Sequence, residues 1–322
     1  MKLNRRQLLL WGLTGVGTTT AGISIQGLTK RSPARVPPPT APPKNALDNP
    51  FDPMQILRDF DYGTIKHEEN CKIREFRVIA DSNPFKLNKA LTFIGWNLNH
   101  RVPGPTLRAK VGDRVRIIFE NHDGHSHTLH FHGKHPAAVD GIEPVRHDQS
   151  FVYEFDVTDY GLFPYHCHVT PVTRHVGKGL YGLLIVDPQW GRPPADEMVL
   201  VMGGYDLDDD GKNDLYAFNG IPNYYRDRPI RIYQNQLIRL YLLNMIEFDA
   251  AVTFHIHANL FELYPMGHSR KPQRIDDVVT IGTAERHILE FRYPYPGRYM
   301  FHPHQDEMAE HGCMGWFEVI AV

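Results

Sequence analysis

The sequence predicts an all-β protein made of two copies of one sandwich or barrel domain. Short apolar runs, many with a two-residue period, follow one another along the chain and are separated by turn residues. No long stretch keeps the period of a helix. Three segments of the first half recur in the second: TLHFHG at 128–133 with TFHIHA at 253–258, GLFPYHCH at 161–168 with GRYMFHPH at 297–304, and GLYGLLIV at 179–186 with GCMGWFEV at 312–319.

The N-terminal residues 1–31 have the pattern of an export signal. Arg5 and Arg6 precede a short, modestly apolar run from Leu8 to Ile25, which is typical of a twin-arginine signal peptide. The alternative is a membrane anchor that is never cleaved. Either case predicts a periplasmic or otherwise extracytoplasmic protein, and no other segment is apolar enough to span a membrane. Residues 32–49, which include SPARVPPPTAPP, predict an extended linker.

The two domains are expected at 50–190 and 191–322, with the boundary in DPQWGRPPADE. The clearest strand candidates are RVRIIFEN, QSFVYEFDV and GLLIVD in the first domain, and RIYQNQLIRLYLLN and HILEFRY in the second. The net charge of −2 gives no basic field for nucleic acid or an anionic membrane.

Histidine carries the main functional signal. The chain has 19 histidines, for which chance predicts about one H-x-H pair. It has five, at 125/127, 130/132, 166/168, 255/257 and 302/304. Taken as a pair, 125/127 is interpreted as surface histidines, although His127 by itself is a candidate for the inner set described next. The other four pairs occupy matching positions of the repeat.

Strand parity divides these side chains into two sites. Residues i and i+2 of a strand share a face, so His166 and His168 point away from Cys167. The same parity puts His127 opposite His130 and His132. An inner set then forms from His127, Cys167 and His175, two imidazoles and a thiolate that match a blue copper centre. Its axial position is occupied by Leu180, which cannot be a ligand and should raise the reduction potential.

The outer set holds eight imidazoles, enough for more than one metal ion. They are His130, His132, His166 and His168 in domain 1, and His255, His257, His302 and His304 in domain 2. Domain 2 has lost the inner site, because Val252 and Pro303 replace the corresponding histidine and cysteine. Structural zinc is a poor alternative, since C-x-x-C spacing is absent.

Two further features leave alternatives open. Cys71 and Cys313 are candidates for a disulfide in an oxidising compartment, and otherwise for two buried thiols. The segment DLDDDGKNDLY at 206–216 starts like a calcium loop, but Ala217 replaces the bidentate Glu at its twelfth position. Residues 206–214 are therefore interpreted mainly as an acidic hairpin turn, with calcium as the less favoured alternative.

Taken together, residues 50–322 resemble multicopper oxidases. The resemblance rests on the four histidine pairs, H-x-x-H-x-H at 127–132, HCH at 166–168 and VPGPTLRAKVGDRVRIIFEN at 102–121. Two domains with the cysteine site in the first are similar to the laccase-like, two-domain branch related to copper nitrite reductases. The resemblance implies two cupredoxin-like Greek-key β-sandwich or barrel domains and a homotrimer, with domain 1 of one subunit meeting domain 2 of the next.

The resemblance also implies about four coppers per chain. His127, Cys167 and His175 would bind type 1 copper, and His130 and His255 type 2 copper. The type 3 pair would be bound by His132, His166, His168, His257, His302 and His304. A donor would deliver electrons near an exposed His175, Cys167 would pass them to His166 or His168, and dioxygen would be reduced to water. Asp140 resembles a family acid near the type 2 site, and Asp306 and Glu307 are weaker candidates whose alternative is a solvated loop.

The sequence is compatible with four functions. The first is an oxidase of phenols or aromatic amines that uses dioxygen. The second is a nitrite reductase, which needs only three histidines at its type 2 site and usually has Asp where this chain has His130. The third is an oxidase of cuprous, ferrous or manganous ions, the cuprous version being weakened by the lack of a methionine-rich segment. The fourth is a copper carrier without turnover.

Overall fold

The computed structural model describes residues 47–68 and 71–322, and these residues belong to one compact unit. The predicted export segment at 1–31 and the proline-rich stretch up to residue 46 lie outside the described residues. The described chain is mostly strands, so the all-β expectation is confirmed.

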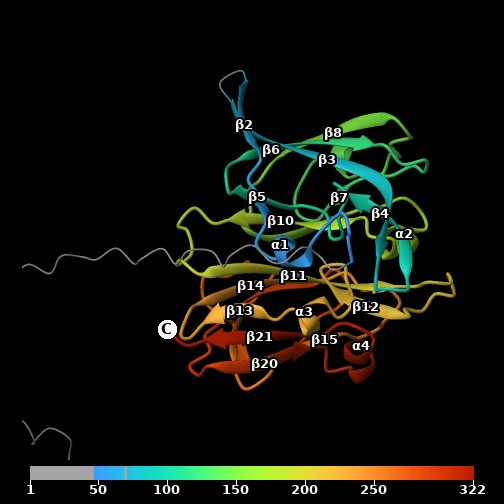
Figure 1. The fold of residues 1–322 in the computed structure, drawn as a ribbon. Helices are drawn as coiled ribbons and strands as arrows, with labels where there is room; N and C mark the ends of the chain where they lie inside the picture. The colour runs from blue at the N-terminus through green and yellow to red at the C-terminus, as the bar shows by residue number, and fades with distance from the viewer. Residues whose placement is uncertain (1–46, 69–70) are drawn as a thin grey trace, which may run out of the picture. The chain divides into compact units, whose positions relative to one another are not determined.

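The first half of the described chain forms two sheets (Figure 1, blue to yellow-green). One has the order β1(Phe60–Asp61), β5(Thr106–Lys110), β10(Tyr181–Asp187), β9(Gly161–His166) and β7(His130–Phe131). The other has the order β2(Thr64–Glu68), β3(Cys71–Lys86), β6(Arg114–Asn121) and β8(Gln149–Asp156), with β4(Thr92–Leu98) also paired to β3.

The second half forms two more sheets (Figure 1, yellow to red). One has the order β12(Leu215–Phe218), β11(Asp196–Tyr205), β14(Ile238–Asn244), β19(Arg286–Phe291), β16(Phe261–Pro265) and β17(Arg274–Asp276). The other has the order β13(Ile230–Tyr233), β21(Gly315–Ile320), β20(Gly297–His302), β15(Thr253–Ile256) and β18(Val278–Thr280). Each sheet draws all its strands from one side of the boundary predicted near residue 190.

The helices of the described residues are short; the first precedes β1 and the others lie between strands. They are α1(Pro53–Ile56), the 3-10 turn η1(Ala137–Val139), α2(Val172–Gly177), α3(Tyr224–Asp227) and α4(Asp306–Glu310). Among the residues that the structure describes, no helix has the length and apolar character needed to cross a membrane.

Burial explains why the strands show two kinds of apolar pattern. In β6, Val115, Ile117 and Phe119 are buried while the alternating side chains are partly exposed, as expected for a strand with one face on the core. In β10 every side chain from Tyr181 to Val186 is buried. Leu184 packs in the core of domain 1, and Leu183 packs in the cluster shared with domain 2. A strand covered on both faces reads as a continuous apolar run.

The two halves are joined by backbone and ionic contacts. The Leu162 amide donates to the Met266 carbonyl at 2.8 Å, and Arg286 Nε donates to the Leu162 carbonyl at 2.9 Å. The buried Arg108 guanidinium donates to Asp187 in the first half and Glu197 in the second. The contacts at Leu162 fix β9, which ends at His166, against the second half of the chain.

Candidate metal centres

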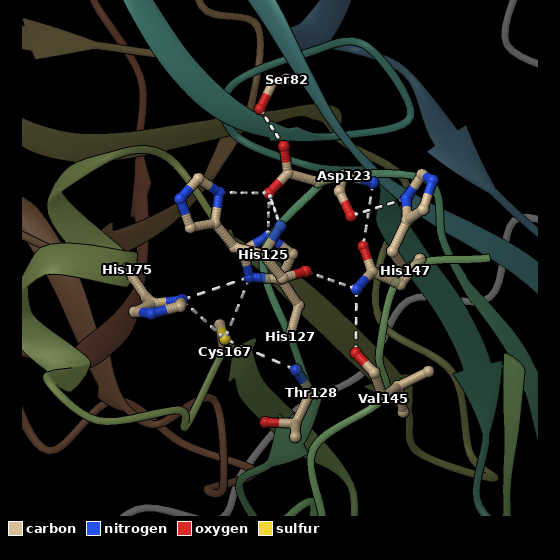
Figure 2. Close-up of polar contacts among 10 residues, drawn as sticks. Ser82, Asp123, His125, His127, Thr128, Val145, His147, Cys167 and His175 are labelled. Atoms are coloured by element: carbon tan, nitrogen blue, oxygen red, sulfur yellow. Dashed lines mark hydrogen bonds and ion pairs between the residues drawn. The ribbon is translucent and has the colours of Figure 1, made fainter. Parts of the chain in front are cut away.

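The inner set comes together as strand parity predicts. His127 precedes β7, Cys167 directly follows β9, and His175 lies on α2. Cys167 Sγ lies 3.8 Å from His127 Nδ1 and 3.3 Å from His175 Nδ1, and the two nitrogens are 3.2 Å apart (Figure 2). His166 and His168 point to a different site, so one extended segment serves two sites on opposite faces.

The triangle of donor atoms fits a trigonal metal ion. Bonds of about 2.0–2.3 Å, typical of nitrogen and sulfur ligands, give donor–donor edges of about 3.6 Å in a trigonal centre. Burial lowers the pKa of His175 to about 4 and also lowers that of His127, so both rings are neutral at pH 7. Burial raises the pKa of the Cys167 thiol, and metal binding must therefore displace its proton. Leu180 is fully buried in the same apolar cluster as Cys167 and offers no ligand atom.

A buried carboxylate orients His127 from behind. His127 Nε2 donates to Asp123 Oδ2 at 2.9 Å, which leaves the Nδ1 lone pair free to face Cys167 and His175 (Figure 2). Asp123 also accepts hydrogen bonds from Ser82 and from the His125 backbone amide. Burial alone would raise the pKa of Asp123, but these hydrogen bonds outweigh it and keep the pKa well below its usual range. The sequence pattern did not single out Asp123, although it lies four residues before His127.

The expectation that His175 is exposed is wrong. Its side chain is 5% exposed and that of His127 is 1% exposed. The interpretation of 125/127 as a surface pair is therefore wrong for His127, and only His125 of the pair is exposed. The ring of Trp96, from β4, covers both, with centroids 4.6 Å from His175 and 5.2 Å from His127. Trp96 lies far from both histidines in the sequence, so no local pattern could reveal this cover.

The outer histidines of domain 1 gather on one face of β7 and β9. His130 pairs with His166 across these strands, and His132 Nε2 lies 3.2 Å from His166 Nε2. The ring of His168 lies 5.2 Å from that of His130. His166 Nδ1 donates to the Cys167 carbonyl at 2.9 Å, which turns its Nε2 lone pair towards the cluster. Burial lowers the pKa of His132 to about 3 and that of His166 to about 4.

Domain 2 reproduces the ring pairings. His255 pairs with His302 across β15 and β20, and His257 Nε2 lies 2.9 Å from His302 Nε2. The ring of His304 lies 5.2 Å from that of His255. His302 Nδ1 donates to the Pro303 carbonyl at 2.6 Å, as His166 does to that of Cys167.

The loop contacts of the two groups of four outer histidines also correspond. We call the group in each domain a half-set. His168 N donates to Thr128 Oγ1 at 3.0 Å, and His304 N donates to Thr253 Oγ1 at 2.7 Å. The repeat therefore preserves both the residue type and the orientation of the outer histidines. Domain 2 has no counterpart of the inner set. At the positions of His127 and Cys167 it has Val252 and Pro303, which are both buried and offer no donor atom.

The two half-sets do not meet within one chain. Every ring contact among the outer histidines of the described residues joins members of the same domain. Each domain therefore holds its own group of four outer histidines.

Asp140 lies beside the outer set. Its carbonyl accepts from His130 Nδ1 at 3.0 Å, and its carboxylate Oδ1 lies 3.1 Å from the same nitrogen. Gly141 lets this loop approach closely, since a Cβ there, at a φ of +77°, would lie 2.2 Å from the Leu129 carbonyl oxygen. His135 also lies near, with Nε2 at 3.6 Å from Asp140 Oδ1.

Asp277 takes the corresponding place in domain 2. Its carbonyl accepts from His255 Nδ1 at 2.7 Å, and its carboxylate lies 4.0 Å from that nitrogen. Sequence reasoning missed both His135 and Asp277, because Asp277 follows its histidine by 22 residues without a shared motif. Asp306 and Glu307 lie exposed on α4, and their proposed role stays a prediction.

Of the two alternatives left open for Cys71 and Cys313, the structure shows unpaired thiols, of which only Cys313 is buried. Both are free: Cys313 is fully buried in the domain 2 core, whereas Cys71 begins the half-buried strand β3 in domain 1. The expected acidic turn joins β11 to β12, which pair antiparallel. Side-chain oxygens of Asp206, Asp208 and Asp210 lie within 4.8 Å of one another there.

The comparisons with known proteins agree with this geometry. Two family models, each described as multicopper oxidase, match residues 83–190 and 192–321. A solved structure titled as a multicopper oxidase has 45% identity and a TM-score of 0.82, covering 84% of this chain and 97% of its own. The cupredoxin-like architecture expected from the sequence is thereby confirmed.

Curated relatives include both an oxidase and a reductase. The copper-containing nitrite reductase of Neisseria gonorrhoeae is 24% identical over 73% of this chain and 65% of its own length. Laccase-22 of Oryza sativa subsp. japonica is 31% identical over 33% of this chain and 21% of its own length. The chain spans just under two thirds of the length of the Neisseria nitrite reductases that it matches, 65% for that of N. gonorrhoeae. Both halves of the sequence match the same family, and a 45% identical member is covered almost throughout, so this chain belongs to the multicopper oxidase family.

Proposed function

We propose that the protein is a copper-dependent, laccase-like oxidase. It oxidises a phenolic, aromatic or metal-ion donor by one electron at a time and reduces dioxygen to water. The observation that carries this proposal is the duplicated outer half-set, with four histidines in each domain held by corresponding contacts. A carrier with one mononuclear site would have no use for eight oriented imidazoles.

The donor chemistry of each set supports a proposal for the type of copper that it would hold. His127, Cys167 and His175 would hold type 1 copper, with the buried Leu180 in the same cluster supplying no further ligand, and His130 and His255 would hold type 2 copper. The type 3 pair would be held by His132, His166, His168, His257, His302 and His304. Bound copper would accept electrons singly from the donor and deliver four of them, with four protons, to one dioxygen, giving two waters.

The chain itself contributes a connection and proton-holding groups. Covalent bonds join the thiol of Cys167 to the neighbouring rings of His166 and His168, and the His166–Cys167 hydrogen bond adds a second link. Asp140 is placed to hold a proton beside His130, and Asp277 is placed similarly beside His255. Asp306 and Glu307 remain candidates for the same task.

A cyclic homotrimer would complete the outer sites. Because the two half-sets make no ring contact within the described residues of one chain, each needs a complement from elsewhere. Closed symmetry would set domain 1 of one subunit against domain 2 of the next and give three identical clusters. A fully active monomer in gel filtration with light scattering would contradict this part of the proposal.

Export by the twin-arginine route to the periplasm or beyond is also proposed, on the strength of Arg5 and Arg6 alone. Replacing both with lysine should retain the protein in the cytoplasm, as measured by cell fractionation. Export of the double variant at the normal level would reject this route.

Nitrite reduction is the second candidate, since nitrite reductases are among the relatives. The complete set of eight outer histidines, His130 included, favours the oxidase. The deciding experiment is copper counting with optical spectroscopy and gas measurement. The oxidase should hold about four coppers per chain, absorb near about 600 nm and consume one dioxygen per four donor electrons. Nitric oxide release from nitrite that exceeds dioxygen uptake would reverse the assignment.

Replacing Cys167 with Ser separates the two sets. The variant should lose the absorption near about 600 nm and donor oxidation together, because serine supplies no thiolate, while the outer coppers stay bound. Cys71→Ser is the matched control and should change neither property, since Cys71 lies away from both sets.

A further inference from the structure

A donor cannot touch the inner histidines directly, so its binding place has to be found around them. His175 and His127 are buried under the ring of Trp96. The guanidinium of Arg174 lies over the ring of Trp96, with Arg174 Cζ 6.0 Å from the ring centroid. A continuous chain of contacts therefore runs from His175 through Trp96 to Arg174, which is 54% exposed.

Arg174 opens onto a pocket of about 300 Å³. One wall is α2, the helix that carries His175, together with Lys178. The opposite wall is the acidic hairpin that follows β11, and Phe248 completes the lining with a side chain that is 44% exposed. This size is at the lower end of the range for small-molecule sites.

The two basic side chains of this pocket share one carboxylate. Arg174 and Lys178 form ion pairs with Asp209 at 3.8 Å and 3.9 Å, which is beyond hydrogen-bonding distance. Lys178 Nζ also lies 4.7 Å from the centre of the Phe93 ring. Within the described residues, neither basic side chain donates a hydrogen bond, so both can still donate to an anionic ligand. The other carboxylate in the lining, that of Asp206, accepts the backbone amides of Asp210 and Gly211 within its own hairpin.

We propose that this pocket binds an aromatic reductant that carries a carboxylate or sulfonate group. The inference rests on the proposed oxidase function and names the class of donor. The anionic group lies between Arg174 and Lys178 as the partner of two charge-assisted hydrogen bonds. The ring packs on Phe248. Asp209 is the counter-ion that the ligand displaces.

The redox step balances without another reactant. A phenolic acid loses one electron to the inner site and its phenolic proton to solvent water, and leaves as a phenoxyl radical. Four such molecules supply the four electrons that one dioxygen accepts, together with four protons, to become two waters.

The test separates binding from turnover by using a ligand that lacks the phenolic O–H. 3,4,5-Trimethoxybenzoate and its neutral amide, 3,4,5-trimethoxybenzamide, have the same ring, and calorimetric titration measures the binding of each. Wild type should bind the benzoate about tenfold more tightly than the amide. Arg174→Gln and Lys178→Gln should each weaken benzoate binding about fivefold and leave amide binding unchanged. Asp209→Asn should strengthen benzoate binding about twofold, because the competing carboxylate is gone.

Lys212→Gln is the matched control, since it removes one positive charge from the same hairpin outside the pocket lining. It should leave benzoate binding unchanged. Equal binding of benzoate and amide, normal benzoate binding by Arg174→Gln and Lys178→Gln, or an equal loss in Lys212→Gln would overturn the proposal.

A kinetic arm links the pocket to turnover. With syringate as donor, KM should rise about fivefold in Arg174→Gln while kcat is kept, and with syringamide neither should change. Selective benzoate binding by a protein that oxidises no donor would support the pocket and reject the oxidase function. Oxidation of both donors without selective binding of the benzoate would support the oxidase function and reject the pocket.

Discussion

The carboxylate of Asp123 lies 2.9 Å from Nε2 of His127, on the side of the ring opposite Cys167. Since a carboxylate only accepts, the proton of His127 sits on Nε2 and the lone pair of Nδ1 faces the inner site. Asp123 is ionised at neutral pH, because its hydrogen bonds keep its pKa low.

Replacing Asp123 with Asn should raise the reduction potential of the copper-loaded inner site. The amide keeps the shape but removes a negative charge that stabilises the oxidised, more positive metal. We expect a rise on the order of 50 mV with the absorption near about 600 nm retained, measured by redox titration followed optically. Asp159→Asn removes a carboxylate paired with Lys134 at the surface and should leave the potential unchanged. An unaltered potential in Asp123→Asn would show that this carboxylate only positions the ring.

Replacing Leu180 with Met should lower the reduction potential of the copper-loaded inner site. A thioether donor near the axial position stabilises the oxidised metal, so the potential should fall on the order of 100 mV. The outer coppers should stay fully loaded, as measured by metal analysis. Leu184→Met, in the same buried cluster, is the control and should not shift the potential. If both variants behave alike, Leu180 does not occupy the axial position.

Lowering the pH should destabilise the copper-free protein between about pH 6.5 and 4. Burial lowers the pKa of His166 and His175 to about 4 and that of His132 to about 3, against an ordinary value of 6.5. Above pH 6.5 both states hold neutral rings and the full stability is present. Below it, the unfolded chain binds protons that the folded chain does not, so the free energy of unfolding falls.

This loss should be on the order of a few kcal/mol and appear as a lower urea midpoint at pH 4.5 than at pH 7. His166→Gln should show a shallower dependence, because one of the contributing rings is gone. A midpoint independent of pH over this range would contradict the prediction.

Two inactive chains should restore activity when they assemble together. His132→Ala with His166→Ala disables the domain 1 half-set, and His257→Ala with His302→Ala disables the domain 2 half-set. In a mixed ring, the intact domain 1 of one chain meets the intact domain 2 of another. Random assembly of equal amounts should recover about a quarter of the wild-type dioxygen uptake, since three quarters of trimers hold one intact cluster of three.

The chains should be co-expressed, and each variant alone should be inactive. If the co-assembled chains remain inactive while each still forms the oligomer, the clusters do not lie between subunits.

Alternation along a strand was sufficient to divide the histidines correctly. His166 and His168 on one face and Cys167 on the other follow from a two-residue period, which is a local property of an extended chain. The repeat then indicated that domain 2 has the same outer half-set, and the contacts of His255 and His302 agree with that prediction. The all-β class could also be predicted from the sequence. A strand buried on one face has alternating apolar residues, as in β6, and a strand buried on both faces has a continuous apolar run, as in β10.

Tertiary structure alone decided what surrounds these side chains. Trp96, from β4, buries His175, and Asp123 orients His127 through a loop that sequence parity does not describe. Cys71 and Cys313 stay apart because one begins a strand in domain 1 and the other lies in the core of domain 2. Which histidines share a face is fixed by the local geometry of an extended strand. Their exposure, their hydrogen-bond partners and the pocket at Arg174 depend on segments that are distant in the sequence and meet only in the folded chain.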